Sequence, residues 1–166
     1  GKRLRGDEAQ NLEDAIACFQ NILTIYTRQD SPTKWADIQI NLGNAYSDRI
    51  RGDQAQNLEE AITCYQNALT IYTWEDLPTQ WAMLQNNLGK SYFDRIRGDK
   101  AENLEEAITR YRNALTVRTR QDFPDDWAKT QNNLGNAYLF HVGGDQAENL
   151  EDAIACFHNA LTIRTG

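Results

Sequence analysis

One sequence unit recurs every 46 residues, and this period constrains the fold more than any other feature of the chain. The tripeptide Asn-Leu-Gly occurs at 41–43, 87–89 and 133–135. Other residues repeat with the same step: Trp35, Trp81 and Trp127, and the pairs Gly6-Asp7, Gly52-Asp53, Gly98-Asp99 and Gly144-Asp145. Such a period predicts an array in which each unit packs only on its neighbours. We expect repeats at 6–51, 52–97 and 98–143, a partial repeat at 144–166, and a single repeat domain over 1–166.

Each unit predicts two helices, and no stretch of the chain has a strand pattern. The first, helix A, begins near Pro32, Pro78 or Pro124 and carries apolar residues at helical spacing, as in Trp81, Leu84, Leu88 and Tyr92. The second, helix B, has a broad apolar face, and we expect it at 11–28, 57–74, 103–120 and 149–165. The chain is therefore expected to be all-α, with seven antiparallel helices in the order B followed by three A–B pairs.

The residues that end one helix and begin the next are also repeated. A Gly-Asp pair precedes each helix B, which is typical of a left-handed glycine followed by a capping aspartate. We expect the main helix to start slightly later, with Asn11, Asn57, Asn103 and Asn149 as its N-caps. Paired carboxylates such as Glu59 and Glu60 follow these caps and are expected to oppose the helix dipole. Residues 1–5 resemble the last turn of a preceding helix, so the chain is expected to be a piece of a longer array.

Composition and motifs exclude several classes of function. A formal net charge of −7 argues against a nucleic-acid partner. No apolar run is long enough to cross a membrane and no signal peptide is evident, so we expect a soluble, cytoplasmic protein with no membrane partner. The three cysteines occupy one repeat position and are expected to be reduced. His141 and His158 are not repeated, and no cofactor, metal or catalytic motif is found, so we expect no enzyme.

The motif Leu88-Gly89-Lys90-Ser91-Tyr92 on helix A, with Ala61, Tyr65 and Ala68 spaced along helix B, resembles the tetratricopeptide repeat. Two departures are visible. The unit has 46 residues in place of 34, and Gln39, Gln85 and Gln131 stand where the family has an aromatic residue. The match is closest to long, near-identical repeat arrays of large bacterial proteins. The resemblance implies a right-handed α-α superhelix whose concave wall is formed by the A helices.

The resemblance also implies a peptide-binding groove along that wall. Family members that clamp a terminal carboxylate have a lysine two residues before the Leu, where this chain has Ile40, Asn86 and Asn132. Asp37 and Met83 are among the other positions on the wall. Asparagine amides suit an extended peptide because they both donate and accept hydrogen bonds. The candidate peptide-binding residues are Asn41, Asn44, Asp48, Asn86, Asn87, Lys90, Phe93, Lys129, Asn132, Asn133, Asn136 and Phe140.

Two interpretations of these residues stay open. The asparagines beside the core leucine either contact a peptide or hold the adjacent helix in place, and the aromatic residues at the end of helix A either line the groove or pack against the following loop. At the level of function, the sequence favours a scaffold that binds a peptide or protein segment. The alternative is a structural spacer or self-associating array, a homo-oligomer formed end to end or by helix exchange, because an uncapped array exposes apolar surface.

Overall fold

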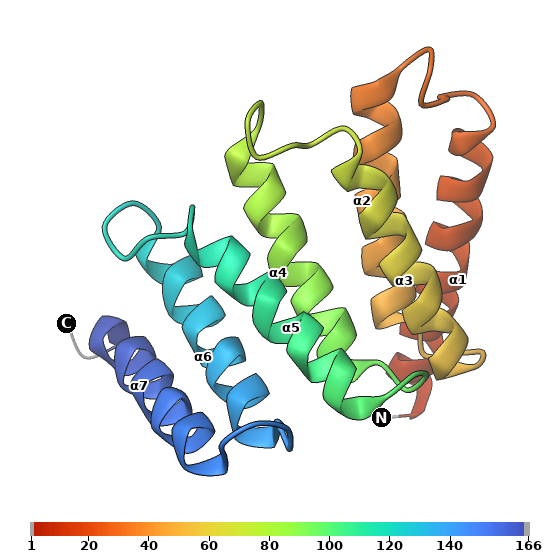
Figure 1. Ribbon diagram of the computed structural model, residues 1–166. Coiled ribbons are helices and arrows are strands. Elements are labelled where there is room, and N and C mark those ends of the chain that lie inside the picture. The colour runs from red at the N-terminus through yellow and green to blue at the C-terminus, as the bar shows by residue number, and fades with distance from the viewer. Residues whose placement is uncertain (1, 165–166) are drawn as a thin grey trace. The chain divides into compact units, whose positions relative to one another are not determined.

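The computed structural model describes residues 2–164, and every regular element in this part of the chain is an α-helix. The helices are α1 (Lys2–Leu23), α2 (Pro32–Asp48), α3 (Gln54–Leu69), α4 (Pro78–Asp94), α5 (Lys100–Leu115), α6 (Pro124–Phe140) and α7 (Gln146–Arg164) (Figure 1). The expected all-α class and helix order are confirmed for the described residues. The helices form two compact units, α1 to α3 and α4 to α7. Superhelix handedness and the grouping of all repeats into one domain stay predictions.

The A helices are α2, α4 and α6, and each begins at a proline as predicted. Proline suits the first helical position because its fixed φ matches the helix and its missing N–H would have no partner there. The first main-chain bonds follow at once, from the Trp81 N–H to the Leu77 carbonyl at 3.0 Å and from the Trp127 N–H to the Phe123 carbonyl at 2.8 Å. The proline therefore fixes where helix A begins, and with it the helical positions of the tryptophan and leucine residues that follow.

The repeated Gly-Asp pairs reverse the chain before α3, α5 and α7. Gly52, Gly98 and Gly144 have φ of +81°, +81° and +73°, the left-handed region that glycine adopts without steric cost. The aspartate that follows caps the next helix, as when Asp53 accepts a hydrogen bond from the Gln56 N–H at 3.2 Å. This part of the expected punctuation is confirmed at these three positions.

The asparagine N-caps were a wrong prediction. α3 already begins at Gln54, so Asn57 lies inside the helix and is almost completely buried. Its amide group donates to the Arg51 carbonyl at 3.0 Å, and Asn103 donates in the same way to Arg97 at 2.8 Å. The side chain therefore satisfies a carbonyl of the turn that precedes the helix. Two capping-type residues four apart competed, and the aspartate nearer the glycine turn is the cap.

The predicted ends of helix B were also too late in three copies. α1, α3 and α5 end at Leu23, Leu69 and Leu115, where a tight turn begins with bonds such as the Ile71 N–H to the Ala68 carbonyl at 3.0 Å. α7 carries a similar sequence and continues to Arg164. Because a helix A follows the first three B helices, the reversal of the chain ends them, a tertiary effect that helix periodicity does not report.

The start of the chain differs from the expected repeat. Gly6 lies inside α1, which runs without a break from Lys2, so Gly6-Asp7 is no turn and Asn11 is no cap. In the later copies, the Gly-Asp pair reverses the chain between a helix A and a helix B, whereas Gly6 and Asp7 are interior residues of α1.

The paired carboxylates do not lie in the first turn, so the dipole explanation is wrong for them. Glu59 and Glu60 are in the second turn of α3, and the dipole effect falls off within the first. They make side-chain contacts instead. Glu60 accepts from Gln56 at 2.8 Å, and Glu106 pairs with Arg110 at 3.3 Å on the same helix face.

Each helix A meets the helix B that follows it at a glycine. A Cβ atom added to Gly89 would lie 2.6 Å from the Tyr111 ring, and one added to Gly135 would lie 2.7 Å from the Phe157 ring. The absence of a side chain lets the aromatic ring of helix B lie directly on the backbone of helix A. The Leu-Gly motif is therefore a packing contact, with Leu88 fully buried next to it.

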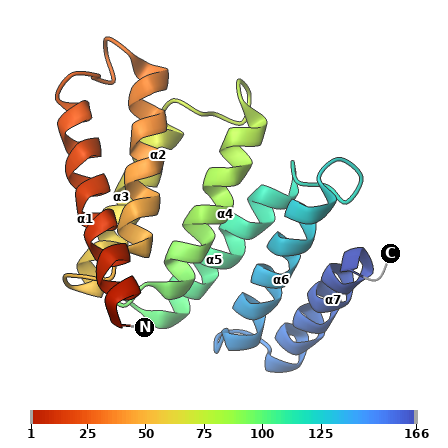
Figure 2. The ribbon, with the colours of Figure 1, turned by 180° about the vertical axis from the view of Figure 1, so that it is seen from behind.

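In the second unit, α5 packs against both α4 and α6, and α6 packs against α7. Figures 1 and 2, which view the molecule from opposite sides, show α5 on one side of α4 and α6. The core between α5, α6 and α7 consists of small, branched aliphatic and aromatic residues: Ala107, Ile108, Tyr111, Leu134, Ala137, Tyr138, Ala153 and Cys156. The glutamines that replace the family aromatic are buried, and two of them are paired: Gln39 accepts from the Asn67 amide and Gln85 from the Asn113 amide, both at 3.3 Å.

A polar contact joins successive B helices through the residue that follows helix A. Arg49 binds Glu13 of α1 with two nitrogens, at 2.7 and 2.9 Å, and also donates to Asn57 at 3.2 Å. The corresponding residue after α6 is His141. Its Nε2 lies 3.5 Å from Glu105 and makes no hydrogen bond although it is buried. The contact of His141 with Glu105 is therefore weaker than the contact of Arg49 with Glu13.

We expect Gly89→Ala to lower the free energy of unfolding by about 1–3 kcal/mol, because the Tyr111 ring must move to admit the new methyl group. Urea denaturation followed by circular dichroism measures the change. Gly6→Ala is the matched control, since no heavy atom lies within 4 Å of the added Cβ, and alanine in a helix is expected to stabilise by about 0.5–1 kcal/mol. Equal stability of the two variants would contradict the packing argument.

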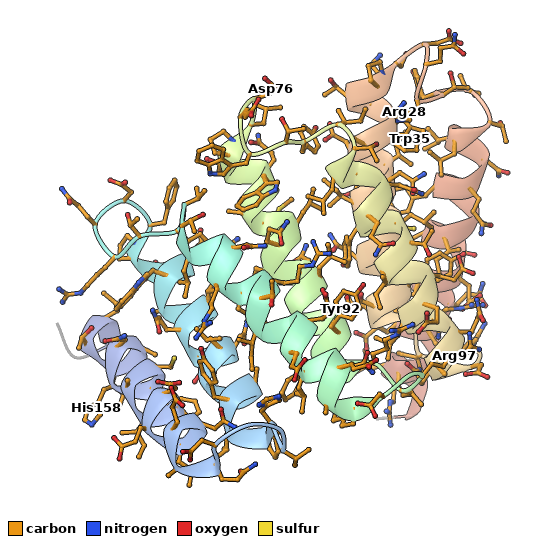
Figure 3. The ribbon with its side chains drawn as sticks, viewed as in Figure 1. Arg28, Trp35, Asp76, Tyr92, Arg97 and His158 are labelled. Atoms are coloured by element: carbon orange, nitrogen blue, oxygen red, sulfur yellow. The ribbon has the colours of Figure 1, made fainter. Side chains whose placement is uncertain are left out.

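His141→Arg is expected to raise the free energy of unfolding by about 0.5 kcal/mol, because a guanidinium group can bind Glu105 as Arg49 binds Glu13. The control is His158→Arg on α7. His158 is exposed and projects away from α6 (Figure 3), so the same change of residue should leave stability unaltered. Thermal unfolding of both variants checks the difference, and a loss of stability in His141→Arg would count against the proposed geometry.

Candidate functional site

Four of the candidate residues surround one hollow of about 140 Å³ in the second unit. Lys90 and Phe93 come from α4, and Asn133 and Asn136 come from α6. The hollow is completed by Asp94 of α4 and by Tyr111, whose ring reaches it from α5. A cation, a carboxylate, two amides and two aromatic rings therefore meet within a small volume, and we call this set the Lys90 hollow.

The A helices position these side chains through a direct polar contact. The Asn86 side-chain oxygen accepts from the Asn133 amide at 3.4 Å and from the Thr130 hydroxyl at 3.2 Å. Asn133 thus borders the hollow and also holds α6 against α4. Asn86 serves the helix contact, which favours the structural interpretation for this asparagine. Thr130, which interrupts the apolar stripe of α6, is completely buried and belongs to the same contact.

The asparagine that follows the motif glycine has different surroundings in different copies. In the first unit, the Tyr65 hydroxyl donates to the Asn44 side-chain oxygen at 2.6 Å. Asn136 is the corresponding residue of α6, and Phe157 replaces the tyrosine there. Because phenylalanine has no hydroxyl, the bond that occupies Asn44 has no counterpart at Asn136. The amide of Asn136 is therefore available to a ligand in the Lys90 hollow.

The aromatic residues at the ends of α4 and α6 contact each other. The Phe93 and Phe140 rings meet edge to face, with centroids 5.9 Å apart and planes at 65°. Lys100, at the start of α5, lies 5.6 Å from the centre of the Phe93 ring and donates to the Phe93 carbonyl at 3.2 Å. Phe140 remains 56% exposed. Phe93 therefore packs on its neighbours and also borders the hollow, and its contact with a peptide stays a prediction.

The other candidate residues lie elsewhere. Asn41, Asn44 and Asp48 are exposed on α2 of the first unit. Asn87 is partly buried on α4, and Asn132 is exposed on α6 outside the Lys90 hollow. Lys129 borders a separate hollow of about 190 Å³ together with Asp125, Ala128 and Ile163. The resemblance implied one wall along the A helices, and within the second unit the structure gathers four of its candidate residues around the Lys90 hollow.

Asp94, which is partly desolvated, is the acidic group of the Lys90 hollow. Desolvation raises the pKa of Asp94, and the nearby Lys90 and Lys100 oppose that shift. Burial also raises the pKa of Tyr111, with a smaller contribution from Asp94, so this tyrosine stays protonated. Sequence reasoning did not include Tyr111. The signal was present in the motif, because a glycine at position 89 allows the ring of the paired helix to reach past the backbone of α4.

The remaining reactive side chains form no cluster. In the part of the chain that the structure describes, no group of histidine, cysteine, aspartate or glutamate side chains is placed to hold a metal ion. Cys64 and Cys156 are buried, which raises their pKa values to about 12 and about 11, whereas Cys18 is exposed. None of the described helices is long and apolar enough to span a membrane.

Comparison with known families matches two parts of the chain. The family model described as soluble NSF attachment protein, SNAP, matches residues 6–87, and the model described as tetratricopeptide repeat matches residues 81–125. No curated protein and no solved structure gives a significant match. Both matched families consist of repeated helix pairs, in agreement with the alternation of α1 to α7.

Proposed function

Because the chain is a tetratricopeptide-like repeat array, we propose that it is a non-enzymatic scaffold that binds a peptide or protein segment on its A-helix face. Repeat families of this kind generally bind protein partners. The observation that carries the finer proposal is the Lys90 hollow, where four residues expected on the binding face border one depression. We further propose a cytoplasmic location and no nucleic-acid or membrane partner, since the net charge is −7.

The chemistry of the hollow suits an extended segment. Lys90 is exposed on one wall and the amide of Asn136 lies on the opposite helix. Main-chain carbonyl groups of a bound segment accept hydrogen bonds from both, and the amide oxygen of Asn136 accepts from an N–H. The Phe93 and Tyr111 rings supply apolar contact beside these polar groups. A main-chain segment with an intervening apolar side chain matches this set of contacts.

The test uses a peptide selected from a random display library against the intact chain. Replacing both Lys90 and Asn136 with alanine is expected to raise its Kd about tenfold, because two hydrogen bonds are worth about 0.5–1.5 kcal/mol each. Isothermal titration calorimetry measures the change. Asn132→Ala is the matched control, since Asn132 is an exposed asparagine on the same helix outside the hollow. Unchanged affinity in the double variant, or an equal loss in the control, would exclude the Lys90 hollow as the binding site.

Self-association is a second candidate function, supported by an apolar stripe on α7. Leu150, Ile154 and Leu161 are 47%, 55% and 52% exposed. One repeat earlier, Leu104 and Ile108 are only 0% and 8% exposed, in a helix that packs against α6. The apolar positions that are buried in α5 are exposed in α7, and we propose that a second copy of the chain covers them.

Sedimentation equilibrium tests this second candidate. We expect a concentration-dependent dimer whose dissociation constant rises at least about tenfold in Ile154→Lys, because burying an isoleucine contributes about 1.5–3 kcal/mol and burying a lysine charge is costly. Ile25→Lys, at an exposed position in the turn after α1, is the control and should leave the dimer intact. A strict monomer at high concentration would rule out self-association.

A further inference from the structure

A second and larger hollow in the second unit lies apart from the Lys90 hollow, toward the N-terminal ends of the same two A helices. It has a volume of about 430 Å³ and lies between the first turns of α4 and α6, beside the segment that joins α5 to α6. Its lining combines apolar side chains with one cation and one acid: Gln80, Met83, Val117, Arg118, Phe123 and Asp126. We call it the Met83 hollow. Concave, mostly apolar sites with a few polar groups are the usual form of a binding pocket.

Arg118 is the unusual member of this lining. It is partly buried, and burial lowers the pKa of its guanidinium group, with Asp126 acting in the opposite direction. Its side chain makes one hydrogen bond, from Nη1 to the neutral Thr130 hydroxyl at 3.3 Å. No ion pair in the described part of the chain involves Arg118. A guanidinium has five N–H donors, so most of the hydrogen-bonding capacity of this charge is unused beside an apolar hollow.

The corresponding position in the first unit, one repeat earlier, is filled by a hydrogen-bonded pair of side chains. Asp37 and Tyr72 occupy the positions of Met83 and Arg118 one repeat earlier, and the Tyr72 hydroxyl donates to the Asp37 carboxylate. Tyr72 is buried in that contact. Met83 and Arg118 have no complementary groups with which to form such a pair. The two positions therefore differ at two residues. The earlier one is filled by a bonded aspartate and tyrosine, and the later one has a hollow beside a poorly paired arginine.

The Met83 hollow is connected to the Lys90 hollow. The Arg118 guanidinium donates to Thr130, Thr130 donates to Asn86, and Asn86 also accepts from Asn133, which borders the Lys90 hollow. Along α4, Met83 and Lys90 are seven residues apart, which corresponds to about 10 Å at the helical rise. An extended segment covers that distance with about three residues. One bound segment therefore reaches both hollows.

We propose that the Met83 hollow is the specificity pocket of the binding face and takes a large apolar side chain whose neighbouring residue is acidic. The apolar side chain packs against Met83, Val117 and Phe123, and the carboxylate accepts hydrogen bonds from Arg118. The acid completes the pairing of a partly buried charge, and a bidentate guanidinium–carboxylate contact is among the stronger polar contacts in proteins. This inference rests on the proposed function and names the chemistry of the segment that the face selects.

Met83 supplies a direct test, because it is the only methionine of the chain. Labelling with [methyl-13C]methionine places a single NMR signal on the wall of the hollow. The probe is the capped dipeptide Ac-Phe-Glu-NH2, compared with Ac-Phe-Gln-NH2 and Ac-Ala-Glu-NH2. We expect the first to shift the Met83 methyl signal in a saturable way, and each of the other two to bind at least about tenfold more weakly, because each lacks one of the two contacts. No shift, or equal affinity for all three, would overturn the proposal.

Two variants locate the contacts. Arg118→Gln keeps the methionine reporter, and we expect it to bind Ac-Phe-Glu-NH2 and Ac-Phe-Gln-NH2 equally; a surviving preference for the acid would contradict the role of Arg118. Met83→Asp combined with Arg118→Tyr copies the pair of the first repeat and is expected to abolish dipeptide binding in calorimetry. Circular dichroism checks its fold, and the three-probe comparison on the unaltered protein decides the question even if this variant fails to fold.

The outcomes separate the inference from the proposed function. A display-selected peptide that depends on Lys90 and Asn136, with no response of Met83 to the dipeptide, would leave the scaffold function standing and remove the specificity pocket. A saturable dipeptide response with no dependence of longer peptides on Lys90 and Asn136 would establish the pocket and refute the proposed binding face.

Discussion

The contact between a glycine of helix A and an aromatic ring of helix B is the constraint on which the other features depend. Because a Cβ at Gly89 would lie 2.6 Å from Tyr111, the two helices approach as closely as backbone and ring allow. This approach buries Leu88 and lets the Tyr111 ring reach the Lys90 hollow, which it lines. One packing contact thus fixes both the helix pair and one wall of the candidate site.

Much of the fold followed from features that act locally. The period, the prolines at the start of helix A and the glycines before Asp53 and Asp99 predicted the helix order, although the same Gly-Asp pair at Gly6 lies inside α1. The predicted helix boundaries were wrong where two local capping signals competed, or where the end of a helix depended on the helix that follows it. Asp53 and Asn57 are both good caps, and only the position of the glycine turn selects the aspartate. The end of α3 at Leu69 depends on the helix that follows it.

The candidate site was predicted less completely than the fold, for a related reason. The family resemblance assigned Lys90, Phe93, Asn133 and Asn136 to one wall, and in the structure these four residues border one hollow. It does not identify which of them already have partners. Asn86 and Asn133 are bonded to each other, and this depends on the approach of α4 and α6. Arg118 lies after helix B, so no analysis of helix A alone could include it.

The difference between the Asp37–Tyr72 pair and the Met83–Arg118 pair concerns how a protein of nearly identical modules distinguishes positions along itself. Both pairs occupy the same place in the same helix framework, and neither contributes to the glycine–aromatic contact. Module duplication therefore reproduces the framework, while two side chains at each junction set its local chemistry. A small set of such residue pairs would let a repetitive chain present a series of chemically distinct sites in a fixed order without any change of fold.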